Sequence, residues 1–529
     1  MADLDISVVE SVRLASPSEE KAVPLSLLDC TTANFSNASA VWLYQKPNLP
    51  AADSFNLGYH LRESLALTLQ SYPQWGGQLK VVKSTDGTVP SEAKHFPPHA
   101  RRFGRIYAHF GTPNDPGVEF VYAKSSATLE SLYSFDRSSK QAFWPCDSSI
   151  FQKFLSPIPI SQPLKSLVGD ESGQLYPLLA VQVTELACGG FVLGLNGAHP
   201  LADATTFISL LKDWASASCS VLDNKPVSRS IPVFNPTLLD NNAAGDINAE
   251  HPDKTIIQQA EALPMHRFDW WAPKSKPPFP FKIPAPYDAE DQEPVGKAMP
   301  WAEWNFTSPV SNYAVHLNRE QVNFLLNKAN ENSSQKLSQH DAVLGHIWSC
   351  IARARGLEND TGPVHCDLVY GVRPSFQLGE KFLGSPTVMM NVELAASEVS
   401  KPSNLTQVAT QVRNTLKKIA DPSNMAAHLH SVAFEKSPQR IWQAFLSQRH
   451  ILVTTWARAG IYNIDFGLGS TCSYAEGLLP DMDGLVLIKE APGPPTSYWT
   501  DNGVDISIHI RSEDMERLVK DPSLFPVDV

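Results

Sequence analysis

The sequence is poor in cysteine. It has seven cysteines in 529 residues, and no two of them form a C-x-x-C pair. An odd number of scattered cysteines argues against a disulfide framework and against a cysteine-based zinc site, and it fits a reducing compartment. His428 and His430 form an H-x-H pair, but no cluster of carboxylates accompanies them. We therefore expect no metal site and no permanently bound cofactor.

Positively charged residues are also fewer than negatively charged ones. Lys and Arg number 43 against 55 Asp and Glu, so the net charge is −12 at pH 7. This balance argues against nucleic acid or an anionic membrane as the main partner. The chain has no run of about 18 apolar residues, the length that a membrane-spanning helix needs. The acidic first residues lack the basic and apolar regions of a signal peptide. We expect a cytoplasmic protein.

Several common catalytic motifs are missing. The sequence contains no G-x-S-x-G, no P-loop and no H-E-x-x-H. The segment Gly467-Leu468-Gly469 is not a dinucleotide fingerprint, because Cys472 stands where the third glycine is required and no βαβ pattern surrounds it. The sequence therefore gives no support for a hydrolase with a serine nucleophile elbow, a P-loop nucleotide-binding protein or a zinc protease.

The length of the chain predicts two domains, since 529 residues exceed what one hydrophobic core usually serves. We place the first domain at residues 1–220 and the second at residues 301–529. The composition changes between them, at residues 221–300, where prolines are frequent and periodicity is weak.

The intervening segment is predicted to be a long crossover between the two domains. It has 13 prolines between residues 226 and 300, including those of Lys276-Pro277-Pro278-Phe279-Pro280. Proline stiffens such a connection, and we expect Trp270 and Trp271 to hold it against the domains. Its aromatic content argues against complete disorder.

Local patterns predict a mixture of helices and strands, which is an α/β (α+β) fold class. Apolar residues at helical spacing, a capping box and strict apolar–polar alternation carry these predictions. The clearest elements are a helix over residues 57–69, a hairpin of residues 181–184 and 191–196 joined at Cys188-Gly189-Gly190, a helix between Ser338 and Gly356, and a strand over residues 504–511.

His199 is the main candidate for chemistry. It lies where the predicted strand 191–196 gives way to an apolar stripe at helical spacing, in the run Gly-Ala-His-Pro-Leu-Ala-Asp. A junction of this kind presents a side chain to a cleft, as a general base requires. Pro200 disfavours a helical conformation for His199, so we expect His199 to be extended and the helix to begin later. Asp203 is then a helix cap or the partner of a cation elsewhere, rather than half of a dyad.

A second group of motifs lies far downstream. Thr454-Thr455-Trp456 is followed by Asp465-Phe466-Gly467-Leu468-Gly469. The two glycines predict a tight turn with a close backbone approach.

Taken together, these motifs resemble the BAHD acyltransferase family. His-Pro-Leu-Ala-Asp at 199–203 and Asp-Phe-Gly-Leu-Gly at 465–469 match the family's two motifs in order, and the segments 25–29, 182–190, 342–355 and 454–456 agree as well. The resemblance covers most of the chain apart from the Pro-rich crossover. It is strongest to the fungal branch, which includes trichothecene 3-O-acetyltransferase and other acyltransferases of secondary metabolism.

The resemblance implies a fold and a reaction. The fold is that of chloramphenicol acetyltransferase: two domains, each a mixed sheet with helices, and a channel between them. Acyl-CoA is the co-substrate, and a small-molecule alcohol or amine is the acceptor. His199 would take the proton of the acceptor, which attacks the thioester directly, and would then protonate the leaving thiolate. Family members are commonly monomers, and we expect a monomer here.

The resemblance also assigns roles to other residues. Trp456 is implied as the donor to the oxyanion, with the Thr454 hydroxyl nearby. Asp203 is implied to pair with Arg373, away from the channel. Asp465, Gly467 and Gly469 are implied to be structural, as the turn near the CoA side.

The sequence departs from the family pattern at two places. Leu468 replaces a tryptophan, and Leu383-Gly384-Ser385-Pro386 stands where many members have a Gly-Asn pair. The residues that bind the CoA phosphates are not identified, although Lys328 is a candidate.

Two other functions stay open from the sequence. In the first, the acyl group comes from a carrier-protein thioester. Enzymes of that kind carry a doubled histidine and a glycine after the aspartate, where this chain has Ala198 and Ala204. In the second, the cleft binds a ligand or closes another bond, as a cyclase does, with His199 as the base.

Overall fold

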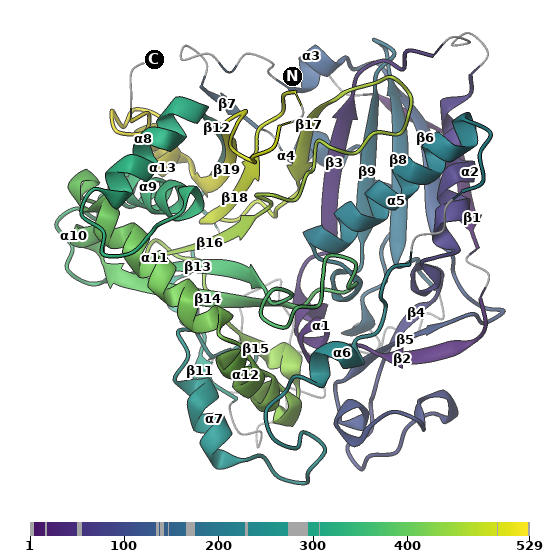
Figure 1. Ribbon diagram of the computed structural model, residues 1–529, viewed down its shortest axis with the longest axis horizontal. Helices are drawn as coiled ribbons and strands as arrows, with labels where there is room; N and C mark the ends of the chain where they lie inside the picture. Colours follow the sequence, from purple (N-terminus) through teal and green to yellow (C-terminus); the bar gives the residue numbers. More distant parts are fainter. Residues whose placement is uncertain are drawn as a thin grey trace.

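Two large mixed sheets form the framework of the protein (Figure 1). The computed structural model describes residues 5–526 apart from 16–17, 50–54, 134–136, 138–141, 147, 165–174, 228–230, 273–294, 306 and 495. Within this part of the chain, two small sheets of three strands accompany the large ones. Among the same residues, no helix is long and apolar enough to cross a membrane.

The first large sheet is built mostly from the N-terminal half. Its strands lie in the order β1 (Ile6–Leu14), β6 (Val118–Ser125), β8 (Leu179–Leu186), β9 (Phe191–Gly197), β3 (Ala38–Tyr44) and β17 (Cys472–Gly477). Only β6 and β8 among these neighbours are parallel. The helices α2 (Leu57–Leu69) and α5 (Ala204–Leu222) pack on it, and their apolar side chains share one core with the strands (Figure 1).

The second large sheet is built mostly from the C-terminal half. Its strands lie in the order β14 (Thr387–Ala395), β13 (Pro363–Gly371), β16 (His450–Thr455), β18 (Leu485–Glu490), β19 (Val504–Arg511), β12 (Val310–Leu317) and β7 (Phe143–Pro145). Four helices gather beside it in Figure 1, namely α8 (Arg319–Asn330), α9 (Gln339–Ala354), α11 (Leu405–Ala420) and α13 (Ser512–Leu518). Strands and helices again share one core.

Shorter elements fill the space around the two large sheets. The small sheets are β2 (Lys21–Pro24), β5 (Ile106–Phe110) and β4 (Gln78–Val81), and β11 (Lys297–Ala298), β10 (Phe268–Asp269) and β15 (Ile441–Trp442). The remaining α-helices in the described residues are α1 (Leu27–Thr31), α3 (Leu129–Leu132), α4 (Ser148–Gln152), α6 (Thr237–Asp240), α7 (Lys254–Glu261), α10 (Ala396–Val399) and α12 (Pro422–Phe434).

The elements predicted from local patterns are confirmed. The leucine repeat forms α2, and the turn at Gly189, with φ +81°, joins β8 to β9 as an antiparallel hairpin. Ser338 and Asp341 form the expected capping box of α9, and Gly356 follows the helix at φ +70°. The alternating residues 504–511 form β19. The α/β two-domain architecture with mixed sheets and helices is as expected.

Each large sheet contains one strand from the opposite half of the chain. β17 pairs with β3 at the edge of the first sheet, and β7 pairs with β12 at the edge of the second. No local pattern indicates which sheet a strand joins, so these exchanges were beyond sequence reasoning. The domain boundaries at residues 220 and 300 stay a prediction.

The described part of the crossover is more ordered than its composition indicates. It contains α6 and α7, and the Asp253 carboxylate caps α7 by accepting from the backbone N–H of Thr255 and Ile256. Trp271 is 2% exposed and belongs to the N-terminal core. Trp270 packs against Trp442 of β15, with 4.9 Å between ring centroids. The expected Pro-rich run at 276–280 lies outside the described residues.

Candidate active site

His199 lies between the last strand of a hairpin and a long helix. β9 ends at Gly197, and α5 begins at Ala204, as the sequence predicts. His199 itself is not extended, which corrects the prediction. It begins a single 3-10 turn with Pro200, closed by a hydrogen bond from the Ala202 N–H to the His199 carbonyl, 3.1 Å. Proline fits this turn because it has no N–H group, and the first N–H groups of a helix have no partner within the helix.

The His199 ring contacts residues from both halves of the chain. Its Nδ1 lies 3.1 Å from the Ser385 hydroxyl, and the Phe35 ring meets it edge-on at 5.1 Å between centroids. Burial lowers the pKa of His199, although the charge of Asp203 works in the opposite direction. The ring is therefore neutral at pH 7, the form that accepts a proton.

Ser385 is held on a loop that several buried groups fix. Its backbone N–H donates to the Asp29 carboxylate at 2.6 Å, and Ser385 is 0% exposed. The preceding Gly384 has φ +129°, and a Cβ there would come within 2.8 Å of Asp29. Burial raises the pKa of Asp29 to about 7, against the hydrogen bonds from Ser26 and Ser385, which lower it. The loop thus brings the second half of the chain against His199.

The ion pair expected between Asp203 and Arg373 is present. Arg373 donates from both Nη atoms to the Asp203 carboxylate, with 3.1 Å from Nη2 to Oδ1. It also donates to the carbonyls of Phe382 and Gly384, at 2.9 and 3.2 Å. Both members are buried, and Asp203 also caps α5 by accepting from the Thr206 N–H. The pair therefore links the helix after His199 to the loop that carries Ser385.

Trp456 and Thr454 lie at the end of β16. The Trp456 ring stacks on Trp42, with 6.4 Å between centroids and 18° between planes. Gly477 gives the ring its space, since a Cβ there would lie 2.7 Å from it. Among the described residues, no hydrogen bond joins Trp456 or Thr454 to His199. Their place at the oxyanion stays a prediction.

The Asp465-to-Gly469 segment forms the tight turn that its glycines predict. The Asp465 carboxylate accepts from the Gly467 N–H at 2.8 Å. Gly467 and Gly469 both adopt positive φ, +73° and +62°. A Cβ on Gly469 would lie 2.7 Å from the Asn48 carbonyl oxygen. The turn therefore packs against the segment that follows β3.

We expect Gly469→Ala to lower the free energy of unfolding by about 1–3 kcal/mol, because alanine is strained at positive φ and its Cβ also meets the Asn48 carbonyl. The matched control is Gly356→Ala, which has φ +70° but nothing within 4 Å of the new Cβ. Midpoints of urea unfolding would separate the clash from the conformational strain. Equal midpoints for the two variants would show that the contact with Asn48 carries no cost.

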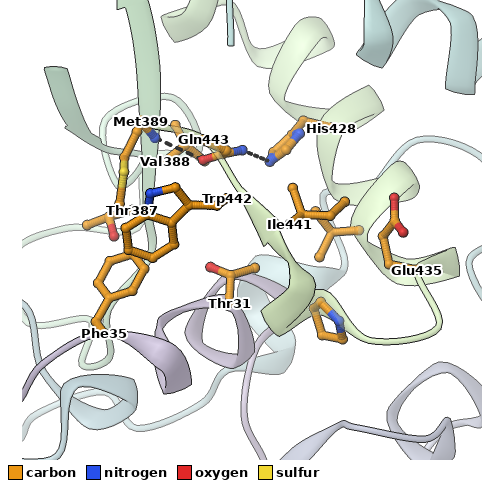
Figure 2. Close-up of a pocket in the computed structure, with 12 residues that line it drawn as sticks. Thr31, Phe35, Thr387, Val388, Met389, His428, Glu435, Ile441, Trp442 and Gln443 are labelled. Atoms are coloured by element: carbon orange, nitrogen blue, oxygen red, sulfur yellow. Dashed lines mark hydrogen bonds between the residues drawn. The ribbon is translucent and has the colours of Figure 1, made fainter. Parts of the chain in front are cut away.

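Phe35, whose ring contacts His199, also lines a pocket. The Phe35 ring lies edge-on to Trp442, 5.0 Å between centroids, and Figure 2 shows both rings with Met389 at one side of the pocket. Gln443 spans its wall, accepting from the Met389 N–H at 3.0 Å and lying 3.2 Å from the His428 ring. The free volume is about 20 Å³, room for one water molecule. A larger molecule therefore needs side chains of the lining to move.

Basic side chains line two further cavities. Lys328 lines one of about 200 Å³ with Arg353 and Lys401. Arg458 lines another of about 430 Å³ beside Asn463, close to the glycine turn. Among the described residues, no hydrogen bond or ion pair joins either cavity to His199. Both cavities offer a cation for a phosphate group.

Ser385, Asp29 and Phe35 are the neighbours of the site that sequence reasoning missed as functional residues. Asp29 and Ser385 lie in segments that we compared with the family pattern. The residues around each of them give no indication that it lies near His199. Their contacts join parts of the chain more than 150 residues apart, as the Ser385 loop does with Asp29 and His199. No periodicity or motif spacing carries that information.

Comparison with known proteins agrees with this architecture. The model of the Transferase family matches residues 104–525. Acyltransferase AFT15-1 of Alternaria alternata is 25% identical, over 98% of this chain and 95% of the relative. The structure of F. graminearum TRI101 complexed with coenzyme A and deoxynivalenol is similar with a TM-score of 0.64 at 15% identity, over 95% of this chain and 98% of the other. Vinorine synthase is similar with a TM-score of 0.60 at 17% identity, over 98% of each chain.

The family match spans most of the chain, and relatives named acyltransferases cover nearly all of it. The strand–histidine–helix junction and the glycine turn lie within the matched residues. The protein is therefore an acyltransferase and belongs to the Transferase family, the BAHD acyltransferases.

Proposed function

We propose that the protein transfers an acyl group, acetyl above all, from acyl-CoA to a hydroxyl group of a small fungal secondary metabolite, with His199 as the general base. The contact between His199 Nδ1 and the buried Ser385 hydroxyl carries this proposal. If the hydroxyl accepts from Nδ1–H, the lone pair lies on Nε2. A neutral imidazole with a fixed free nitrogen is suited to remove a hydroxyl proton.

The reaction proceeds by direct attack. Nε2 of His199 takes the proton as the acceptor oxygen forms a bond to the thioester carbonyl carbon. The tetrahedral intermediate then breaks its carbon–sulfur bond, and the imidazolium returns the proton to the thiolate. Trp456 and Thr454 are the proposed donors to the oxyanion. Both are partly exposed, so their N–H and O–H groups stay accessible.

Two observations support CoA as the donor. The similar TRI101 structure holds coenzyme A and deoxynivalenol. The chain has Ala198 and Ala204 where carrier-protein-dependent enzymes have histidine and glycine. We further propose that the protein acts as a monomer in the cytoplasm, and that Asp203, Arg373, Asp465, Gly467 and Gly469 support the site without touching the substrate.

The proposed pocket for the acceptor is the one bounded by Phe35 and Trp442. The Phe35 ring connects this pocket to His199, because it contacts both His199 and Trp442. The pocket's apolar and aromatic walls with a few polar groups are typical of small-molecule sites, but its free volume of about 20 Å³ has to widen before an acceptor fits.

The test is release of free thiol from acetyl-CoA and longer acyl-CoAs, with hydroxylated metabolites as acceptors and a no-acceptor control. We expect acceptor-dependent release, and mass spectrometry of the product would identify an ester. A parallel arm offers the same acyl groups on a carrier protein. Turnover in that arm alone would overturn CoA as the donor.

The pKa of His199 predicts the pH dependence of the reaction. Burial lowers this pKa below 6.5, so the ring stays neutral until the pH falls below that value. We expect kcat/KM to fall on the acid side with a midpoint below pH 6.5. A midpoint at or above pH 7 would contradict a base whose pKa the protein lowers. The profile should be measured with two overlapping buffers at each pH.

Ser385→Ala should lower kcat by about tenfold and leave the KM for acyl-CoA unchanged, because the hydroxyl fixes the tautomer and direction of the His199 ring. Ser385→Thr keeps the hydroxyl and should retain more of the rate than the alanine variant. Equal rates for both variants, or a change confined to KM, would show that the hydroxyl does not position the base.

A further inference from the structure

Three histidines from distant segments meet beside the second large sheet. His365 and His450 are register partners on the parallel strands β13 and β16, and their rings stack at 4.3 Å between centroids. His266 comes from the crossover, just before β10, and its ring lies 4.9 Å from that of His365. One ring nitrogen from each histidine lies within 4.8 Å of those of the other two.

Backbone hydrogen bonds on both sides of His266 hold it next to the two strand histidines. The Asn391 N–H of β14 donates to the Pro264 carbonyl at 2.7 Å, two residues before the histidine. Phe268, two residues after it, pairs with Trp442 of β15. The crossover is thus tied on both sides of His266, which leaves its ring facing the two strand histidines.

Oxygen atoms lie close to all three rings and are hydrogen-bonded to two of them. The Asn391 side-chain oxygen lies 3.1 Å from Nδ1 of His365. The Asp367 carboxylate, 0% exposed, lies 3.5 Å from Nδ1 of His450 and 3.3 Å from Nε2 of His266. The contacts of His365 and His450 have hydrogen-bond geometry, so an N–H directed at each oxygen leaves the Nε2 atom of these two rings as a lone-pair donor. Metal-binding histidines in proteins are held in this way by carboxylates and amide oxygens.

The cluster also contains buried polar atoms without a satisfactory hydrogen bond. His266 Nε2 and Asp367 Oδ1 are both buried, and within the described residues neither has a partner of hydrogen-bond geometry. Buried polar atoms without a partner are rare in folded proteins, and a bound ion is one way to satisfy them. This observation is independent of the grouping of the three rings.

We propose that His266, His365 and His450 form a binding site for one divalent transition metal of the Zn²⁺ class, with Asp367 as the carboxylate that orients the His450 ring. Zinc–nitrogen bonds of about 2.0–2.1 Å place tetrahedral ligands about 3.4 Å apart, so small rotations of the three rings complete the site. Imidazole donors select Zn²⁺, Co²⁺ or Ni²⁺ over Mg²⁺ and Ca²⁺. His266 and His365 side chains are each 13% exposed, which gives the ion a route from solvent.

The metal would join three parts of the fold at one point. It would tie the crossover to β13 and β16, and through β10 it would fix β15, which carries Trp442. Its role is structural, because it holds the wall of the pocket rather than the reacting groups. The sequence alone predicts no metal site, since the three histidines share no local motif.

The test uses the full chain after treatment with a chelator. Co²⁺ titration, followed by visible absorption and calorimetry, should show one ion bound per chain. Binding should weaken by at least about 10²-fold in His365→Asn and in His266→Asn. The matched controls are His251→Asn, an exposed histidine outside the cluster, and His199→Gln, and both should bind as the wild type does.

Zn²⁺ should also raise the melting temperature of the wild type and of His251→Asn but not of His365→Asn, and Mg²⁺ should raise none of them. X-ray absorption at the zinc edge needs no variant and should show nitrogen neighbours at about 2.0 Å. Sulfur neighbours at about 2.3 Å, no binding by the wild type, or equal affinity in the cluster variants would each overturn the proposal. None of these measurements uses an acyl donor, so their outcome is separate from that of the proposed reaction.

Discussion

Replacing His199 with alanine is expected to lower kcat by about 10²–10⁴, the usual contribution of a general base. The loss follows from removing the nitrogen that takes the acceptor proton. The ring is partly exposed, and its hydrogen bond to Ser385 is the polar contact it makes with another side chain among the described residues. The fold should therefore survive, and the measurement is steady-state thiol release alongside the melting temperature.

His199→Gln is the sharper companion variant. Glutamine can keep a hydrogen bond to the Ser385 hydroxyl but cannot act as a base near neutral pH. We expect it to melt close to the wild type and to be as slow as the alanine variant. His251→Ala, at an exposed position, should change neither quantity. Activity within about tenfold of the wild type in either His199 variant would remove this residue from the chemical step.

Asp203→Asn is expected to reduce the free energy of unfolding by about 3–5 kcal/mol, because it leaves the Arg373 guanidinium buried without its counter-ion. Asparagine caps helices as well as aspartate does, so the capping of α5 is preserved and the change isolates the charge. Activity should fall as well, since Arg373 also holds the Gly384 carbonyl of the loop that carries Ser385.

Two comparisons make this prediction specific. Asp253→Asn alters an exposed capping aspartate of α7 that has no ion pair in the described residues, and it should cost less than about 0.5 kcal/mol. The double variant Asp203→Asn with Arg373→Met should lose less than the sum of the single changes, since neither charge is left alone. An Asp203→Asn protein with an unchanged melting temperature and no activity would instead indicate a direct role in proton transfer.

Sequence reasoning reached the parts of the site that local chemistry determines. Alternation and helical spacing placed His199 between β9 and α5, and the residue type at Asp203 predicted its cap. The conformation of His199 was the local error: proline excludes an ordinary α-helix but allows a 3-10 turn. Positive φ at Gly467 and Gly469 was also predictable, because glycine is the residue that adopts it without strain.

The rest depends on contacts between distant segments, which no window of sequence contains. Ser385 contacts His199, and Phe35 contacts both His199 and Trp442, only once both halves of the chain are folded. The pairing of Asp203 with Arg373 was reached through family resemblance rather than through the pattern around either residue. The meeting of His266, His365 and His450 had no signal at all, since each is single in its own segment.

The exchange of strands between the sheets limits how this enzyme can open. The chain crosses between the two large sheets before and after β7, and again before and after β17, so a motion that separated the sheets would have to stretch or rearrange these connections. We therefore expect the crossings to oppose a clamshell movement of one sheet against the other. We expect access to His199 to come from small local displacements, such as rotation of the Phe35 ring or a shift of the two-residue strand that carries Trp442. On the proposed function, a few side chains in a rigid frame would then set the selectivity for the acceptor, rather than closure of one sheet on the other.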